Sequence, residues 1–206
     1  MSKPWQSRRA APTVRKGDLR EQQILDSAEH LLSTVGYAAM TVGDIAQAAG
    51  LTRAALYFYF GSKHDVLAAL VARTAQVLTE EAGLARTDSR SVDEVIAGAV
   101  ERTAALWLAH GPVMRMAVDL GTTVPDIGQM WSAAAEESID VIAQVLQRCG
   151  VPSHDGPEGA AALARALCWM IERNFYQASK ISAEAIGDTS QTCQTIWRAV
   201  ADGTAR

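Results

Sequence analysis

The stretch TVGDIAQAAGLTRAALYFYFGSK, residues 41–63, decides the fold of this chain. It predicts two short helices separated by a tight turn. Thr41 and Asp44 have the spacing of a capping box, with aspartate in the place of glutamate, and they open the first helix. Gly50 breaks that helix, because a tight turn needs the positive φ that glycine accepts. Thr52 then caps the second helix.

The apolar residues of this stretch have the spacing of a helix-turn-helix motif. Two helices that cross closely need a small residue at the contact, a glycine in the turn and an apolar residue on the inner face of the second helix. Ala46, Gly50 and Leu56 supply these features, and Ile45 and Leu51 extend the core. In such a motif the second helix enters the major groove of DNA. Taken alone the spacing is a weak signal, since an alanine-rich chain also produces it by chance.

Four aromatic residues follow on the second helix, just before the next helix begins. Tyr57 and Tyr59 have hydroxyl groups that can reach phosphate. Phe58 and Phe60 are expected to be buried. The next helix starts at residues 62–63, a serine and a lysine, whose backbone N–H groups and ammonium make a natural anion site. The pattern therefore indicates nucleic-acid binding at this end of the chain.

Together, the hydrophobic spacing, the glycine and the ending LY-x-x-F-x-x-K resemble the TetR family of transcriptional regulators. The likeness is strong over residues 20–70. It implies an all-α fold, with an N-terminal three-helix DNA-binding domain that contains the helix-turn-helix and a C-terminal helical ligand-binding and dimerisation domain. We predict a disordered basic arm at 1–17, the DNA-binding domain at 18–65 and the ligand-binding and dimerisation domain at 66–206.

The resemblance also implies which residues contact DNA. Those expected on phosphates are Thr41, Tyr57 and Lys63, and those expected towards base edges are Thr52, Arg53, Ala54 and Ala55. Tyr59 stands where many members have histidine, so its contact can be a phosphate or a base edge. Gly43 stands where some members have an arginine that reads guanine, which leaves Arg53 as the best base reader. An ordinary solvent-exposed helix surface is the alternative for these side chains.

Composition agrees with a helical globular protein. Of 206 residues, 49% are hydrophobic and 20% are charged, and glycine and proline are sparse within the periodic stretches. These features favour helix nearly throughout, with about nine helices. No apolar run is long enough to span a membrane and no secretory signal follows Met1, so we expect a cytoplasmic protein. The cysteines at 149, 168 and 193 and the scattered histidines form no ligand pattern, and we expect no metal and no cofactor.

Charge is unevenly distributed along the chain. Residues 1–63 carry 8 Lys and Arg against 5 Asp and Glu, whereas residues 64–206 carry 11 against 18. A basic N-terminal part on an acidic body suggests a polyanion partner at one end only. Arg15 and Lys16 in the predicted arm could follow the minor groove or the DNA backbone, and an inert solvated tail is the equal alternative.

Large aromatic and methionine side chains on several predicted helices of the body could line one elongated apolar pocket. The candidates for ligand binding are Trp107, Met130, Trp131, Trp169, Met170, Tyr176 and Trp197. Ordinary core packing is the alternative for each of them. Residues 166–173 and 194–197 resemble a mycobacterial member of the family, in which an asparagine on the penultimate helix would bind the polar group of the ligand. Cys168 and Ile171 stand at the matching places, which implies a more apolar ligand here.

These observations favour a homodimeric, DNA-binding transcriptional regulator, and we expect a repressor. A small apolar effector would release it from a palindromic double-stranded DNA operator. The last two long helices, about 158–180 and 183–201, would form the dimer interface that the resemblance implies, or be internal. The alternative is a helical small-molecule-binding protein or an enzyme without operator-specific DNA binding. Catalysis is not expected, because the sequence has no carboxylate pair, nucleophile–base set, phosphate-cradling loop or metal cluster.

Overall fold

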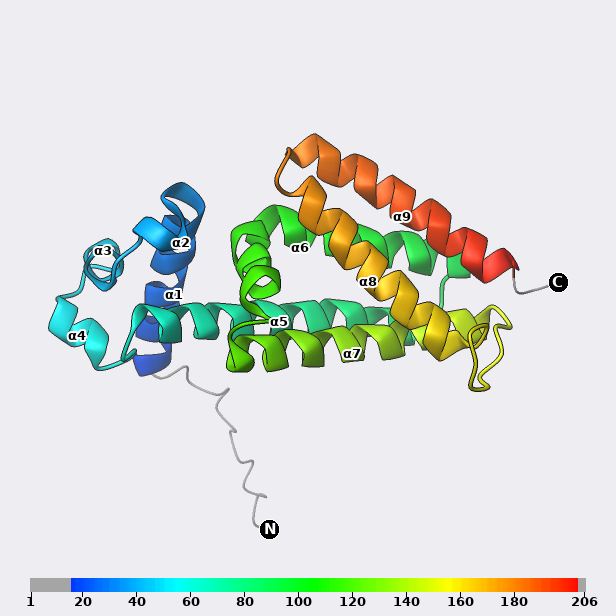
Figure 1. Ribbon diagram of the computed structural model, residues 1–206, viewed down its shortest axis with the longest axis horizontal. Helices are drawn as coiled ribbons and strands as arrows, with labels where there is room; N and C mark the ends of the chain where they lie inside the picture. Colours follow the sequence, from blue (N-terminus) through cyan, green and yellow to red (C-terminus); the bar gives the residue numbers. More distant parts are fainter. Residues whose placement is uncertain (1–15, 204–206) are drawn as a thin grey trace, which may run out of the picture. The chain divides into compact units, whose positions relative to one another are not determined.

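The computed structural model describes residues 16–203, which form nine α-helices and no strand (Figure 1). In chain order the helices are α1 (Lys16–Thr34), α2 (Gly36–Ala39), α3 (Val42–Ala48), α4 (Arg53–Tyr57), α5 (Lys63–Thr87), α6 (Val92–Leu120), α7 (Pro125–Arg148), α8 (Ala160–Ala178) and α9 (Ala183–Gly203). The expected all-α fold is confirmed. Among these helices none is both long and apolar enough to cross a membrane. The predicted basic arm, with Arg15, lies outside the described residues except for residues 16–17, where α1 begins.

The chain divides between Lys63 and His64 into two compact units. In the first unit α3 packs against both α1 and α4. Ile24, Ala28 and Leu32 recur at helical spacing along α1 and are buried. Because residues four apart share one face of a helix, α1 contributes one continuous apolar stripe to this small core.

The short helix α2 is not among the helices that the sequence predicts. Its residues read GYAA, and the preceding Val35 makes no side-chain capping hydrogen bond. Gly36 has a φ of 79°, which turns the chain sharply after α1. A helix of one turn without a polar cap has no sequence signal of its own. Whether it forms therefore depends on the tertiary context.

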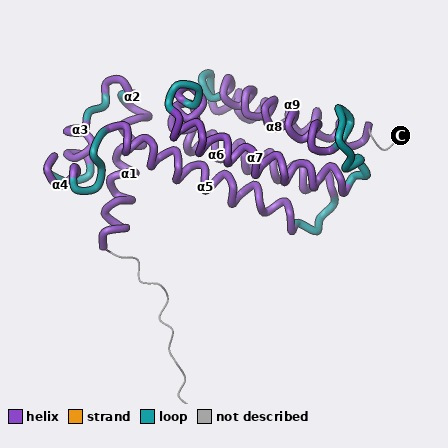
Figure 2. Tube along the Cα trace, turned by 60° about the horizontal axis from the view of Figure 1, so that its bottom comes forward, coloured by secondary structure: helices purple, strands orange, loops and turns teal. Residues whose placement is uncertain are grey.

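The second unit consists of α5–α9. Helix α7 packs against α8, and α6 packs against α7 and α9. Helices α8 and α9 run side by side in both views of the chain (Figures 1 and 2). Ile127, Leu146 and Phe175 are fully buried between these helices. The amphipathic helices of the body therefore enclose one apolar core.

Helix α6 is kinked where the sequence predicts that a helix stops. The break expected at the Gly111–Pro112 pair is a bend, and the helix continues to Leu120. His110 has a non-helical backbone, with φ −120° and ψ 15°. Pro112 causes this bend, because proline has no N–H to donate and its ring meets the carbonyl four residues earlier. The number of helices agrees with the prediction, since the missed α2 replaces the second piece of α6.

The end of α6 meets the start of α7 through two glycines. A Cβ atom placed on Gly128 would lie 2.2 Å from the carbonyl oxygen of Gly121. No side chain fits at that distance, so the close approach of the two backbones requires glycine at position 128. Pro125 lies in the first turn of α7, as predicted.

Candidate functional site

The turn between α3 and α4 has the geometry that the sequence predicts. The hydroxyl oxygen of Thr41 accepts from the backbone N–H of Asp44 at 3.2 Å, and the N–H of Thr41 donates to the Asp44 carboxylate at 2.9 Å. These bonds complete the capping box. The Thr41 hydroxyl also donates to the Asp44 carboxylate at 2.7 Å, and this bond, together with that from the Thr41 N–H, lowers the pKa of Asp44. Gly50 has a φ of 65°, and the N–H of Leu51 donates to the carbonyl of Ala46 at 2.8 Å. This closing bond is that of a Schellman motif, which ends α3 and reverses the chain.

Helix α4 is capped at one end and held on its inner face. The hydroxyl oxygen of Thr52 accepts from the N–H of Ala55 at 3.1 Å. Leu56 is fully buried, as are Ile45 and Ala46 on α3. The inner faces of the two helices therefore interlock, and the opposite face of α4 is turned to solvent.

The solvent face of α4 presents hydrogen-bonding groups side by side. Thr52, Arg53, Ala54 and Tyr57 are exposed, and Ala55 is half-buried. Arg53 donates through Nη2 to the Tyr57 hydroxyl at 3.1 Å, and its guanidinium carbon lies 5.6 Å from the centre of the Tyr57 ring. Such donors can bind phosphate oxygens and the acceptor atoms of guanine.

Tyr59 and Lys63, which follow α4 in the chain, are half-buried. The ammonium of Lys63 donates to the backbone carbonyl of Tyr37 at 2.9 Å and lies 4.4 Å from the centre of the Tyr37 ring. A lysine ammonium has three donors, so this contact orients the side chain and uses one of them. Thr41 is exposed at the start of α3, with its hydroxyl engaged in the capping box.

The expectation that Phe58 is buried is wrong, whereas that for Phe60 is correct. Phe58 is 85% exposed and Phe60 is 7% exposed. Leu56 and Phe60 lie one helical turn apart and share the inner face, and Phe58 lies between them on the opposite side. Its ring packs against that of Tyr59 in a T-shaped arrangement, with the ring centres 5.4 Å apart.

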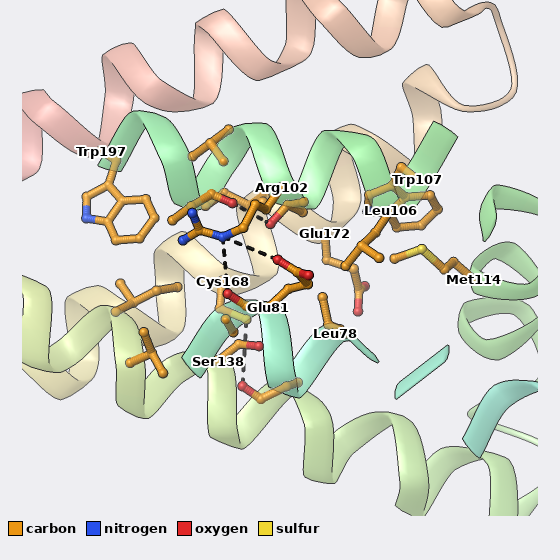
Figure 3. A pocket seen from close by; sticks show the side chains of 18 of the residues that line it. Leu78, Glu81, Arg102, Leu106, Trp107, Met114, Ser138, Cys168, Glu172 and Trp197 are labelled. Carbon is orange, nitrogen blue, oxygen red and sulfur yellow. Dashed lines mark hydrogen bonds and ion pairs between the residues drawn. The ribbon is translucent and has the colours of Figure 1, made fainter. Parts of the chain in front are cut away.

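The second unit encloses a cavity whose empty space is about 800 Å³, including the part that opens to solvent. Its walls come from all five helices of the unit (Figure 3). Three of the predicted ligand-binding residues line it: Trp107 on α6, Trp131 on α7 and Trp197 on α9. Most of the side chains that line it are apolar or aromatic, as is typical of a small-molecule site.

Four predicted residues do not line this cavity: Met130, Trp169, Met170 and Tyr176. Met130 and Met170 directly precede Trp131 and Ile171, which do line it. The lining residues recur three or four positions apart along α7 and α8, as Cys168, Ile171 and Glu172 do on α8, and Met130 and Met170 fall outside these faces.

Tyr176 and Trp169 have other surroundings. The hydroxyl of Tyr176 donates to Asp119, and the ammonium of Lys180 lies 3.8 Å from the centre of its ring. Trp169 is 38% exposed on the surface of α8. Tyr176 therefore ties α8 to α6, and Trp169 faces away from the cavity.

Three charged residues in the cavity wall are not among the predicted ligand-binding residues: Glu81 on α5, Arg102 on α6 and Glu172 on α8. The indole N–H of Trp131 donates to the Glu172 carboxylate at 2.8 Å. Burial raises the pKa of Glu172, since the carboxylate loses hydration. No local motif marks these residues, because charged side chains on an amphipathic helix usually face water.

Arg102 and Cys168 give the cavity a mixed lining. The Nε of Arg102 donates to the backbone carbonyl of Glu81 at 3.2 Å and lies 3.6 Å from its carboxylate. Burial raises the pKa of the Cys168 thiol to about 12, so this sulfur stays protonated. Cys168, at a place where the resemblance implies a polar ligand contact, thus carries a weak donor, and the stronger polar groups of the wall are Glu81, Arg102 and Glu172.

A helix-turn-helix whose second helix exposes arginine and tyrosine defines a DNA-binding protein. Residues 24–70 match the family model described as bacterial regulatory proteins, tetR family. The chain is 30% identical over 190 residues to the transcriptional regulator EthR of Mycobacterium tuberculosis, which covers 85% of this chain and 81% of that protein. The chain therefore belongs to the TetR family of transcriptional regulators.

Further similarities agree with this assignment. A stretch of 55 residues is 47% identical to EthR of Mycolicibacterium smegmatis, covering 27% of this chain and 25% of that protein. A transcriptional regulator from Saccharomonospora viridis, solved in complex with choline, has the same fold with a TM-score of 0.71 and 21% identity. That match covers 89% of this chain and 97% of the other. These proteins are transcriptional regulators and not enzymes, as expected for this chain.

Proposed function

We propose that this chain is a homodimeric repressor that a small molecule, bound in the cavity of the second unit, releases from a palindromic DNA operator. The observation that carries the proposal is the exposed face of α4, where Arg53 and Tyr57 are held side by side. A face of this kind has no role in the core of its own unit. Its donors suit the acceptor-rich surface of a DNA groove.

In this proposal the DNA contacts divide into two groups. Arg53 reads a base edge, with Thr52, Ala54 and Ala55 beside it. Thr41, Tyr57, Tyr59 and Lys63 contact phosphates, and Tyr59 can also reach a base edge. The DNA-binding domain is residues 18–65, and the ligand-binding and dimerisation domain is 66–206. The place of action is the cytoplasm, where the operator DNA is.

The proposed effector site is the cavity lined by Trp107, Trp131 and Trp197. Its mainly apolar lining, which comes from five helices, supports binding of a small, mainly apolar molecule. The choline complex of the Saccharomonospora regulator is in keeping with this role for the fold.

The proposed dimer forms through α8 and α9. Trp169 and Ile196 are 38% and 39% exposed on these two helices. Large apolar side chains at the surface support packing against a second copy of the same helices. Two copies would place two α4 helices on half-sites about one helical turn of DNA apart, or slightly more.

Selection of bound sequences from a random DNA library, using the full chain, tests this proposal. A repeated pseudo-palindromic sequence is the expected result, with a dimer in analytical ultracentrifugation. A gel shift of that sequence, titrated with small molecules, then measures release. Recovery of no preferred sequence would favour the alternative, a helical small-molecule carrier without operator-specific binding.

A further inference from the structure

Phe58 is the most exposed large apolar side chain among the described residues, at 85%. Its backbone is helical, with φ −68° and ψ −30°, and its N–H donates to the carbonyl of Ala55 at 3.3 Å. The residue therefore continues the helical path of α4 beyond Tyr57. Its T-shaped contact with Tyr59 orients the ring and leaves most of it in water. An aromatic side chain stabilises a protein mainly by leaving water, so Phe58 takes little part in the core of the first unit.

The position of Phe58 on α4 places it in line with Ala54. Residues four apart on a helix lie one turn apart on the same face, and Ala54 is exposed there. The buried Leu56, which holds α4 on its core, lies on the opposite side. Ala54 and Phe58 thus form an apolar row beside the row of donors from Arg53 and Tyr57. The apolar row is continuous with the proposed DNA-binding face.

The chemistry of the major groove supplies an apolar partner for this row. Its base edges carry hydrogen-bonding groups, together with the C5-methyl group of thymine, which alanine and phenylalanine side chains recognise by apolar contact. A protein partner that covered Phe58 would also cover the exposed guanidinium of Arg53, which loses hydration against an apolar surface. A DNA groove suits both side chains, because it presents acceptors and methyl groups along the same edge.

We propose that Phe58 determines DNA specificity by placing its ring against the C5-methyl group of a thymine in each half-site of the operator. Arg53 then reads a base by hydrogen bonds, and Phe58 reads another by apolar contact. This inference rests on the proposed function of α4 as the helix that reads the operator, and it adds a residue to that site.

Removal of single methyl groups from the operator tests the inference. The probe is the duplex that the full chain selects from random DNA. Deoxyuridine, which pairs as thymidine does and lacks only the methyl group, replaces the thymines of one half-site one at a time. Fluorescence anisotropy should show one position at which the replacement lowers the affinity of the natural protein about three- to five-fold, as expected when one methyl group is no longer buried.

Variants of Phe58 assign that methyl group to the ring. Phe58→Ala should bind the unmodified operator at least about four-fold more weakly and should no longer distinguish thymine from deoxyuridine at that position. Phe58→Leu keeps an apolar side chain and should retain part of the discrimination. Leu84→Ala is the matched control, because Leu84 is 53% exposed on α5 in the second unit. It should keep both the affinity and the discrimination of the natural protein.

Three results would overturn the inference. The first is an operator affinity of Phe58→Ala equal to that of the natural protein. The second is a scan in which no deoxyuridine affects binding, or in which its effect persists in Phe58→Ala. The third is loss of the dimer in Phe58→Ala by analytical ultracentrifugation, since the ring would then belong to a protein contact. Each of them leaves the proposed regulator standing if an operator is selected, whereas recovery of no preferred sequence removes both proposals.

Discussion

Arg53 donates through Nη2 to the hydroxyl oxygen of Tyr57, 3.1 Å away and one turn further along α4. Both side chains are exposed, so the pair is maintained at the surface without support from the core. The bond limits the rotamers of a long side chain before any partner arrives. Less side-chain entropy is then lost on binding, which favours a defined contact over a diffuse one.

Arg53→Ala is expected to lower affinity mainly for the selected operator. A bidentate contact from arginine to guanine contributes about 1–3 kcal/mol of discrimination, so operator affinity should fall by that amount and affinity for random DNA much less. Fluorescence anisotropy with both DNAs measures the difference. An equal loss on the two DNAs would remove Arg53 from base reading. Arg86→Ala, in the second unit, is the matched control for the loss of one positive charge.

Lys63→Ala is expected to weaken binding to every DNA sequence. A phosphate contact releases about one counterion, so the slope of log affinity against log salt should decrease by about one. Titrations at several salt concentrations measure it. Because the ammonium also contacts Tyr37, thermal unfolding of the variant must be followed in parallel. A slope equal to that of the natural protein would mean that Lys63 makes no phosphate contact.

Phe58 and Phe60 should respond oppositely to truncation. Phe60→Ala removes a buried side chain and is expected to lower the free energy of unfolding by about 3–5 kcal/mol. Phe58→Ala removes an exposed ring and should change it by less than about 0.5 kcal/mol. Urea denaturation followed by circular dichroism compares the two variants. Similar losses for both would show that Phe58 is packed in solution.

Glu172→Gln is expected to change the pH dependence of stability. Burial raises the pKa of Glu172 in the folded protein above its ordinary value of 4.5, and this outweighs the Trp131 hydrogen bond and the charge of Arg173. The folded state therefore binds the proton more tightly than the unfolded state, and stability falls as pH rises from 4.5 through the folded pKa.

Glutamine keeps an acceptor for Trp131 and removes the titration. The free energy of unfolding of the variant, relative to the natural protein, should therefore increase between pH 4.5 and pH 8. Urea denaturation at several pH values provides the measurement. A difference that does not vary with pH would place the Glu172 carboxylate in contact with water.

The helix-turn-helix could be predicted in detail because its signals are local. Capping by Thr41 and Thr52 and the positive φ of Gly50 each depend on residues within one turn. The same reasoning failed for Phe58, since α4 has only 5 helical residues and its periodicity is too short to assign the inner face. Pro112 was correctly predicted to disrupt the helix, but α6 continues beyond it because the segments on both sides of the proline pack against other helices.

The residues that line the cavity could be predicted less well from the sequence. Trp107, Trp131 and Trp197 were identified by size, and size alone could not separate them from Trp169 on the surface. Arg102 and Glu172 could not be found, because their inward orientation depends on how five helices pack together. The polar half of a binding site on a helical bundle is thus fixed by tertiary structure and not by any short motif.

The bend of α6 at His110 separates two parts of the cavity wall. Arg102 and Trp107 precede the bend and Met114 follows it, all on one helix. An occupant that contacts both Arg102 and Met114 bridges the bend from one straight segment to the next. It therefore holds the two segments of α6 at one angle to each other, and the length of the occupant can set that angle.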